Sequence, residues 1–170
     1  MSDLPQPGSA AEPVPATPEA LGEVGAEAAD ALLVFAPRMS HLLRHRLQQA
    51  DPPLTYRQYR VLGHIRDGAT SLKALNQRTV ISMSALSETI DGLFRKGLVT
   101  RVPSERDRRG IDLGLSETGA DVLARTTPVL RSIAAEVLAH VPESDRAAFL
   151  RAVRAMQDPV RDTLAAHHPQ

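Results

Sequence analysis

The sequence predicts a mainly α-helical protein that carries one small β-hairpin. Beyond about residue 25, apolar residues recur three or four positions apart, and prolines or glycines separate the successive helical stretches. Residues 97–119 break this pattern, because they read as a helix end, a short strand, a charged loop, a second strand and a new helix start. The 170 residues are enough for one domain of ordinary size with flanking arms.

The N-terminal region is expected to contain a tail and a helix. Residues 1–18 contain five prolines among small and acidic residues, and this composition predicts a disordered, acidic, Pro-rich tail. Residues 19–50 are expected to form an N-terminal helical segment, with clear helical spacing of apolar residues over about 26–49. Pro37 lies inside this run and predicts a kink or a break.

The next stretch predicts three helices with recognisable start signals. Thr55 and Gln58 have the spacing of a capping box, so a helix is expected from there to about residue 66. Thr70 or Ser71 is expected to cap a short second helix. A third helix begins at Ser82 or Ser84 and ends before Gly97. Its apolar stripe consists of Leu86, Ile90, Leu93 and Phe94.

A hairpin and two long helices complete the chain. Strands are expected at 98–102 and 111–115, followed by a helix that Ser116 caps and that reaches about residue 140, with a kink at Pro128. A last helix is expected from residues 142–144 to about 164, with a bend at Pro159. A hairpin directly after two short helices is a wing. Residues 54–116 are therefore expected to form a winged helix-turn-helix lobe.

The helices on either side of this lobe predict a dimer. The segments 19–50 and 117–166 carry apolar faces that a compact central lobe cannot cover alone. A second copy of the chain is the simplest cover, and two-fold symmetry is the commonest arrangement. The expected architecture is thus a winged helix-turn-helix lobe flanked by N- and C-terminal dimerisation helices.

The formal net charge of zero hides a strong segregation of charge. Residues 1–30 contain six acidic residues and no basic one, whereas residues 57–109 contain 11 basic and 5 acidic residues. Clustered positive charge favours a polyanionic partner. Arg106, Arg108 and Arg109 lie at the tip of the expected wing, within reach of a DNA groove, where negative potential collects between the phosphates. These features predict a protein that binds double-stranded DNA.

The composition also excludes several classes of protein. The absence of Cys excludes disulfides, thiolate metal sites and Cys-based oxidant sensing. No apolar run approaches the roughly 20 residues that span a bilayer, and no secretory signal is recognisable, so a cytoplasmic protein without a membrane partner is expected. The sequence has no phosphate-binding Gly-rich loop and no nucleophile motif, which predicts that it is not an enzyme and needs no cofactor.

Several stretches share their order and spacing with a known family. They are LTYRQYRVL at 54–62, SLKAL at 71–75, ISMSAL at 81–86, IDGLFRKGLVTR at 90–101, DRR at 107–109 and LSETG at 115–119. In this combination, they resemble the MarR family of bacterial transcription regulators. The resemblance implies an obligate homodimer that presents one winged helix-turn-helix to each half of a pseudo-palindromic site. It also implies, in many relatives, an effector pocket between the dimerisation helices and the DNA-binding lobe.

The candidate DNA-binding residues lie on the third helix of the lobe and around it. The N-terminal half of this helix is expected to enter the major groove, where the hydroxyl groups of Ser82, Ser84 and Ser87 meet base edges or phosphates. This face has no Lys or Arg, and Glu88 and Asp91 would repel phosphates. The candidates for phosphate contacts are therefore Arg57, Arg60, Lys73, Arg78 and Arg95.

The wing residues have roles that the resemblance implies. It assigns a minor-groove contact to Arg109, the last residue of an Asp-x-Arg motif. Asp107 is expected to brace the loop through a charge-assisted hydrogen bond. Arg106 and Arg108 are expected to bind phosphates.

Candidate residues for an effector or a metal are fewer. Met39, His41, Arg60 and His64 are the candidates for lining an effector pocket. His41 and His45 lie four residues apart on one helix face, which is a spacing suited to metal binding. With no third ligand identifiable, no metal site is assigned, and a metal-responsive regulator is kept as an alternative.

Together, these observations predict a sequence-specific, DNA-binding transcriptional regulator. It is expected to act as a homodimeric repressor on a pseudo-palindromic operator and to be released by a small-molecule effector of unknown identity. The alternative is a winged-helix protein-interaction module, in which helix 82–96 binds a protein and the arginines of the wing contact acidic partners. Substitution of Arg109 separates the two, because it should weaken DNA binding only in the first.

Overall fold

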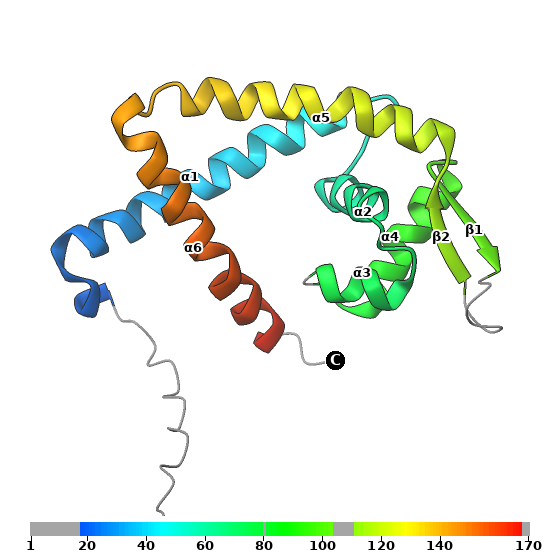
Figure 1. The fold of residues 1–170 in the computed structure, drawn as a ribbon, viewed down its shortest axis with the longest axis horizontal. Coiled ribbons are helices and arrows are strands. Elements are labelled where there is room, and N and C mark those ends of the chain that lie inside the picture. The colour runs from blue at the N-terminus through cyan, green and yellow to red at the C-terminus, as the bar shows by residue number, and fades with distance from the viewer. Residues whose placement is uncertain (1–17, 80, 104–110, 168–170) are drawn as a thin grey trace, which may run out of the picture. The chain divides into compact units, whose positions relative to one another are not determined.

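The computed structural model describes residues 18–79, 81–103 and 111–167. Its elements follow in the order η1 (Pro18–Leu21), α1 (Gly22–Gln48), α2 (Tyr56–Arg66), α3 (Leu72–Arg78), α4 (Met83–Arg95), β1 (Val99–Pro103), β2 (Ile111–Leu115), α5 (Glu117–Leu138) and α6 (Glu143–His167) (Figure 1). The chain divides into two units, Met1–Ser40 and His41–Gln170, so α1 begins in the first and ends in the second. These elements confirm the predicted fold class, a mainly α-helical chain with a small two-stranded sheet.

The described part of the first unit consists of η1 and the N-terminal part of α1. None of the side chains from residue 20 to residue 40 is buried, and Val24 and Leu33 are 81% and 74% exposed. After the 3-10 turn η1, α1 begins at Gly22, within the expected segment 19–50, and continues through Pro37. The predicted break at Pro37 is therefore wrong, because proline removes one backbone hydrogen bond and the turns on either side keep theirs.

The helices of the second unit begin at the side chains that the sequence indicates. Thr55 caps α2, and the reciprocal bonds with Gln58 complete a capping box. Ser71 rather than Thr70 caps α3, since its side chain accepts a hydrogen bond from the backbone of Ala74. These caps fix the starts of α2 and α3, the first two helices of the lobe.

The end of α4 leads directly into the hairpin. Gly97 adopts a φ of +67°, its N–H donates to the carbonyl of Phe94, and the next N–H, of Leu98, donates to the carbonyl of Leu93. This pattern is a Schellman motif, which ends the helix and turns the chain. β1 and β2 then pair antiparallel, with Val99 opposite Leu115 and Pro103 opposite Ile111. The observed strands confirm the predicted hairpin to within one residue.

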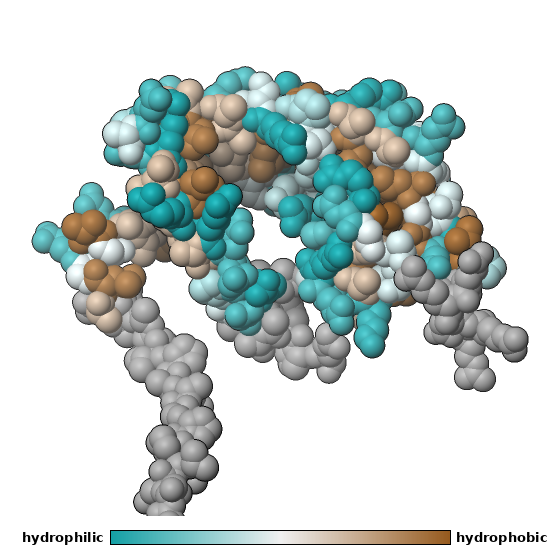
Figure 2. Space-filling model, viewed as in Figure 1, coloured by the Kyte–Doolittle hydropathy of each residue, from teal (hydrophilic) through white to brown (hydrophobic). Residues whose placement is uncertain are grey.

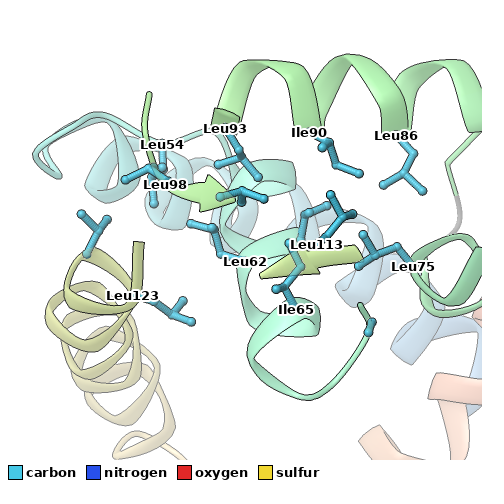
Figure 3. Packing of buried hydrophobic residues seen from close by; sticks show 14 of the residues in the cluster. Leu54, Leu62, Ile65, Leu75, Leu86, Ile90, Leu93, Leu98, Leu113 and Leu123 are labelled. Carbon is cyan, nitrogen blue, oxygen red and sulfur yellow. The ribbon is translucent and has the colours of Figure 1, made fainter. Parts of the chain in front are cut away.

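A single hydrophobic core holds the lobe together. It gathers buried residues from α1, α2, α3, α4, both strands and α5, including Leu47 of α1. Figure 3 shows others of them, among them Leu62, Leu75, Leu86, Leu93, Leu113 and Leu123. The hairpin is also tied to the loop before α3, because the N–H of Leu113 donates to the carbonyl of Thr70 at 2.7 Å. The core therefore joins the winged helix-turn-helix to α5, as far as Leu130.

The C-terminal helices leave much apolar surface uncovered. α5 runs through Pro128 and α6 through Pro159, so neither proline ends its helix. No side chain of α6 up to residue 163 is buried, and Phe149, Leu150, Met156 and Val160 are 40–56% exposed. Figure 2 shows apolar patches on the exposed surface.

Among the described helices, none is long and apolar enough to cross a membrane.

Candidate nucleic-acid interface

The N-terminal half of α4 presents a polar surface to solvent. Ser82 caps the helix by accepting a hydrogen bond from the N–H of Ala85 at 3.3 Å, and its hydroxyl lies 3.0 Å from that of Ser84. Both serines are exposed, whereas Ser87 is half-buried. Leu86, Ile90 and Leu93 are buried on the opposite face of the same helix. The apolar stripe thus fixes the helix and leaves its positive N-terminal end free for an anionic partner.

The C-terminal half of α4 is joined to the wing strand β1. A carboxylate oxygen of Asp91 accepts a hydrogen bond from Arg101, with which it forms an ion pair. The same guanidinium lies 5.0 Å from the centre of the Phe94 ring, at a distance typical of a cation–π contact. The negative charge of Asp91, which we expected to repel phosphates, is therefore compensated within the protein.

Phe94 corrects one expectation and identifies a residue that sequence reasoning missed. We expected Phe94 on the buried stripe, but its side chain is 48% exposed, because it follows Leu93 and lies at the edge of the apolar face. Arg101 was not a candidate functional residue. One signal could have identified it. Asp91 and Phe94 lie three positions apart near the end of α4, and Arg101 follows them on the next strand.

A second cation fixes α4 on the side of α2. Lys96, the C-terminal cap residue of α4, donates to the carbonyl oxygen of Pro53 at 2.6 Å and to Oε1 of Gln58 at 2.9 Å. Gln58 also takes part in the capping box of α2. The start of α2 and the end of α4 thus share one hydrogen-bond network.

The basic residues predicted to contact phosphates differ in how far they are already engaged. Arg57, Arg60, Lys73 and Arg95 are exposed, and none of them has an ion pair or a side-chain hydrogen bond with another described residue. Arg78 is also exposed, but its Nη1 donates to the backbone carbonyl of Asp67 at 2.9 Å. The structure thus leaves several guanidinium and ammonium groups of the lobe open to solvent.

The wing tip carries the remaining predicted site residues. Arg106, Asp107, Arg108 and Arg109 lie outside the described residues, between the ends of β1 and β2. Their predicted contacts with DNA stay predictions.

An open groove lies among α1, α2 and the segment from the end of α3 to α4. Its volume is about 720 Å³, and its lining includes four arginines, Arg44, Arg57, Arg60 and Arg78. His64 and the acidic Glu88 also line it. Of the four candidates for an effector pocket, the groove brings together Arg60 and His64, whereas Met39 and His41 do not line it.

The imidazole of His64 has an altered proton affinity in this groove. Burial lowers the pKa of His64 below its usual value, and the positive charges of Arg60 and Arg78 lower it further. The carboxylate of Asp67 acts in the opposite direction with a smaller effect. A neutral imidazole is therefore favoured at neutral pH, and it can both donate and accept a hydrogen bond.

The histidine pair of α1 gains no further ligand in the described ranges. Within them, no group of three or more His, Asp or Glu side chains is placed to hold a metal ion. His45 lines a small cleft against α5 together with Leu42 and Ile133. Among the residues that the structure describes, none thus joins His41 and His45 as a third metal ligand.

Comparisons with known sequences point to one family. A sequence model of the MarR family matches residues 53–110. The HTH-type transcriptional repressor NicR of Pseudomonas putida is 29% identical over 131 residues, which cover 71% of this chain and 83% of NicR. The transcriptional regulator HosA of Escherichia coli is 30% identical over 114 residues, which cover 66% of this chain and 84% of HosA.

Solved structures show the same fold. Wild-type MarR of E. coli in its apo form matches with a TM-score of 0.64 at 21% identity, over 76% of this chain and 96% of that one. FabT of Streptococcus pneumoniae, solved in complex with DNA, matches with a TM-score of 0.72 at 14% identity, over 81% of this chain and 98% of that one. A mutant MarR of E. coli complexed with operator DNA matches with a TM-score of 0.66 at 21% identity, over 77% of this chain and 94% of that one.

Proposed function

Because the chain belongs to the MarR family, we propose that it is a DNA-binding transcriptional regulator that acts as a homodimer on a pseudo-palindromic operator. The observation that carries this proposal is the exposed N-terminus of α4, where Ser82 and Ser84 face solvent while the opposite face is buried. A helix held in this way fits the major groove, where side chains near its N-terminus reach base edges. Repression is part of the proposal, supported by the name of the relative NicR.

The cations around α4 supply the charged phosphate contacts that uncharged serine hydroxyl groups do not provide. Arg57, Lys73 and Arg95 extend from α2, α3 and α4 and are exposed, without ion-pair partners among the described residues. Such cations fix the register of a helix on the duplex and make binding depend on salt. The resemblance adds Arg109 on the wing as a minor-groove contact, with Arg106 and Arg108 on phosphates.

The proposed dimer follows from the uncovered apolar side chains of the outer helices. Phe149 and Met156 lie seven residues apart on α6, so they occupy one face, and both are exposed in a single chain. Apolar surface of this kind on a soluble protein marks an interaction site. A second copy covers it and places two α4 helices on one DNA molecule.

We also propose that a small-molecule effector binds in the groove beside α4. Its four arginines against one glutamate favour a small anion, and the half-buried His64 offers a further hydrogen bond to it. Since the groove is lined by Glu88 and Thr89 of α4, an occupant would contact the helix that we propose reads DNA. An effector bound there would thereby change the affinity for the operator.

A single added charge tests the proposed DNA contact. Ser84→Glu places a carboxylate at the exposed end of α4, where we expect it to weaken binding to duplex DNA at least about tenfold by repelling phosphates. Ser144→Glu adds the same charge to the first turn of α6 and serves as the matched control. Fluorescence anisotropy with a labelled duplex measures both affinities. Equal affinity for the two variants would contradict the proposal and favour a protein-interaction module.

A further inference from the structure

The cations of the lobe fall into two groups by what their charged atoms contact. Arg57, Lys73 and Arg95 have no ion-pair or side-chain hydrogen-bond partner among the described residues, and they are free to meet phosphates. Arg101 and Lys96 are different, because their charged groups are already bound to protein atoms. Net charge alone therefore overstates the number of phosphate anchors.

Arg101 joins the wing to α4 through two contacts on one side of that helix. Its guanidinium forms an ion pair with Asp91 and lies over the ring of Phe94, and these two residues are three positions apart on α4. The side chain of Arg101 is 31% exposed, which is less than the exposure of Asp91 or of Phe94. The carboxylate of Asp91 thus already binds a donor of the guanidinium that a phosphate would otherwise contact.

The two ends of α4 are held very differently. At its C-terminal end, Lys96 binds Pro53 and Gln58 at the start of α2, and Arg101 binds the helix from β1. At its N-terminal end, the side-chain hydrogen bonds of Ser82 and Ser84 stay within the helix itself. Beyond the buried stripe of Leu86, Ile90 and Leu93, the polar side-chain contacts that tie α4 to other elements therefore lie at its C-terminal end.

From this geometry, we infer that Arg101 is a positioning residue, which acts through Asp91 and Phe94 to make α4 and the wing engage DNA as one rigid unit. The inference rests on the proposed function, because it concerns how the same surface binds a duplex. It assigns Asp91 a favourable role, although its charge has the same sign as a phosphate.

Asp91→Asn distinguishes a positioning role of Arg101 from a phosphate-binding role, because the two roles predict opposite changes in the affinity for DNA. If Arg101 positions α4, loss of the carboxylate should weaken binding to a duplex enriched from a random library about tenfold, with little change for a random-sequence duplex. Arg101→Gln should have a similar effect, and the double variant should be no weaker than the weaker single variant. If Arg101 instead binds phosphate, Asp91→Asn would remove a repulsive charge and strengthen binding.

The dependence of affinity on salt gives a second readout. Loss of one phosphate contact lowers the slope of log affinity against log salt by about 0.9, so Arg95→Gln is expected to do so and Arg101→Gln is not. Asp91→Glu keeps the carboxylate and is expected to retain the affinity of the unaltered chain. This variant separates the loss of the ion pair from a failure to fold, which circular dichroism reports directly.

The outcomes separate the inference from the proposed function. If the unaltered chain bound neither duplex, the proposed function would fail before any variant was compared. If it bound the enriched duplex and Asp91→Asn bound as well or better, the inference alone would be overturned. A reduced salt slope for Arg101→Gln, with equal losses on both duplexes, would likewise identify Arg101 as a phosphate anchor.

Discussion

The hydroxyl of Ser116 donates a hydrogen bond to the carbonyl oxygen of Gly97 at 2.6 Å and so joins the start of α5 to the end of α4. The hydroxyl oxygen of Ser116 also caps α5 by accepting a hydrogen bond from the N–H of Gly119 at 2.9 Å. The N–H of Ser116 donates to the carbonyl oxygen of Leu98 at 3.2 Å. One residue thus connects the helix that we propose reads DNA to a helix that we propose forms the dimer.

The close contact behind this junction predicts the effect of enlarging Gly119. A Cβ at this position would lie 1.9 Å from the carbonyl oxygen of Leu98, so the backbone would have to move. We expect Gly119→Ala to lower the free energy of unfolding by about 2 kcal/mol or more, in the range of overpacked cores. Urea denaturation followed by circular dichroism measures this change.

Gly63 provides the matched control on another helix. A Cβ there meets no atom within 4 Å, so Gly63→Ala should raise the free energy of unfolding by about 0.5–1 kcal/mol through better helix propensity. Equal effects of the two substitutions would contradict the predicted packing at Gly119.

The lowered pKa of His64 predicts a dependence of stability on pH. The pKa of His64 is about 6.5 in the unfolded chain and lower in the folded chain. At pH values between these two, His64 binds more protons in the unfolded state than in the folded state. The free energy of unfolding should therefore fall as the pH drops below about 6.5, and it should fall less in His64→Gln. Urea denaturation at pH 7.5 and pH 5.5, within about one unit of that value, compares the two proteins.

The control for His64 is His140, which lies in the short turn between α5 and α6 and is exposed. His140→Gln should leave the pH dependence of the unaltered chain in place. If His64→Gln lost as much stability as the unaltered chain over this interval, the lowered pKa of His64 would be wrong.

The exposed face of α6 predicts the effect of a charge on assembly. Phe149→Glu should weaken the proposed dimer at least about tenfold, because it places a carboxylate in an apolar interface. Analytical ultracentrifugation over a range of protein concentrations measures the dissociation. Leu72→Glu changes a similarly exposed residue on α3 and should leave assembly unchanged. A Phe149→Glu protein that stayed dimeric would remove α6 from the proposed interface.

Local signals in the sequence predicted the fold well because each element has its own start or stop. The capping box at Thr55, the cap at Ser116 and the helix end at Gly97 depend on residues within three positions, which a sequence displays directly. Prolines were less informative. Pro37 and Pro128 lie inside continuous helices, because a long helix tolerates one missing hydrogen bond.

The candidate site was harder to predict because its contacts join residues that are distant in sequence. The sequence indicates that Ser82 and Ser84 face away from the apolar stripe, and the structure places both on an exposed surface. It does not indicate that Lys96 reaches Pro53, which lies 43 positions earlier, or that Arg101 compensates Asp91. Such pairs depend on how helices and strands pack, and periodicity contains no information about this.

Selection of bound sequences from a random duplex library, followed by a salt titration on the enriched duplex, tests the central claim most directly. A homodimer with two reading helices should enrich a pseudo-palindrome whose half-sites lie about one helical turn apart, roughly 10 base pairs. Its affinity should fall steeply with salt. Enrichment of no sequence, with only weak and salt-sensitive binding, would contradict the account and leave the basic lobe as a non-specific surface.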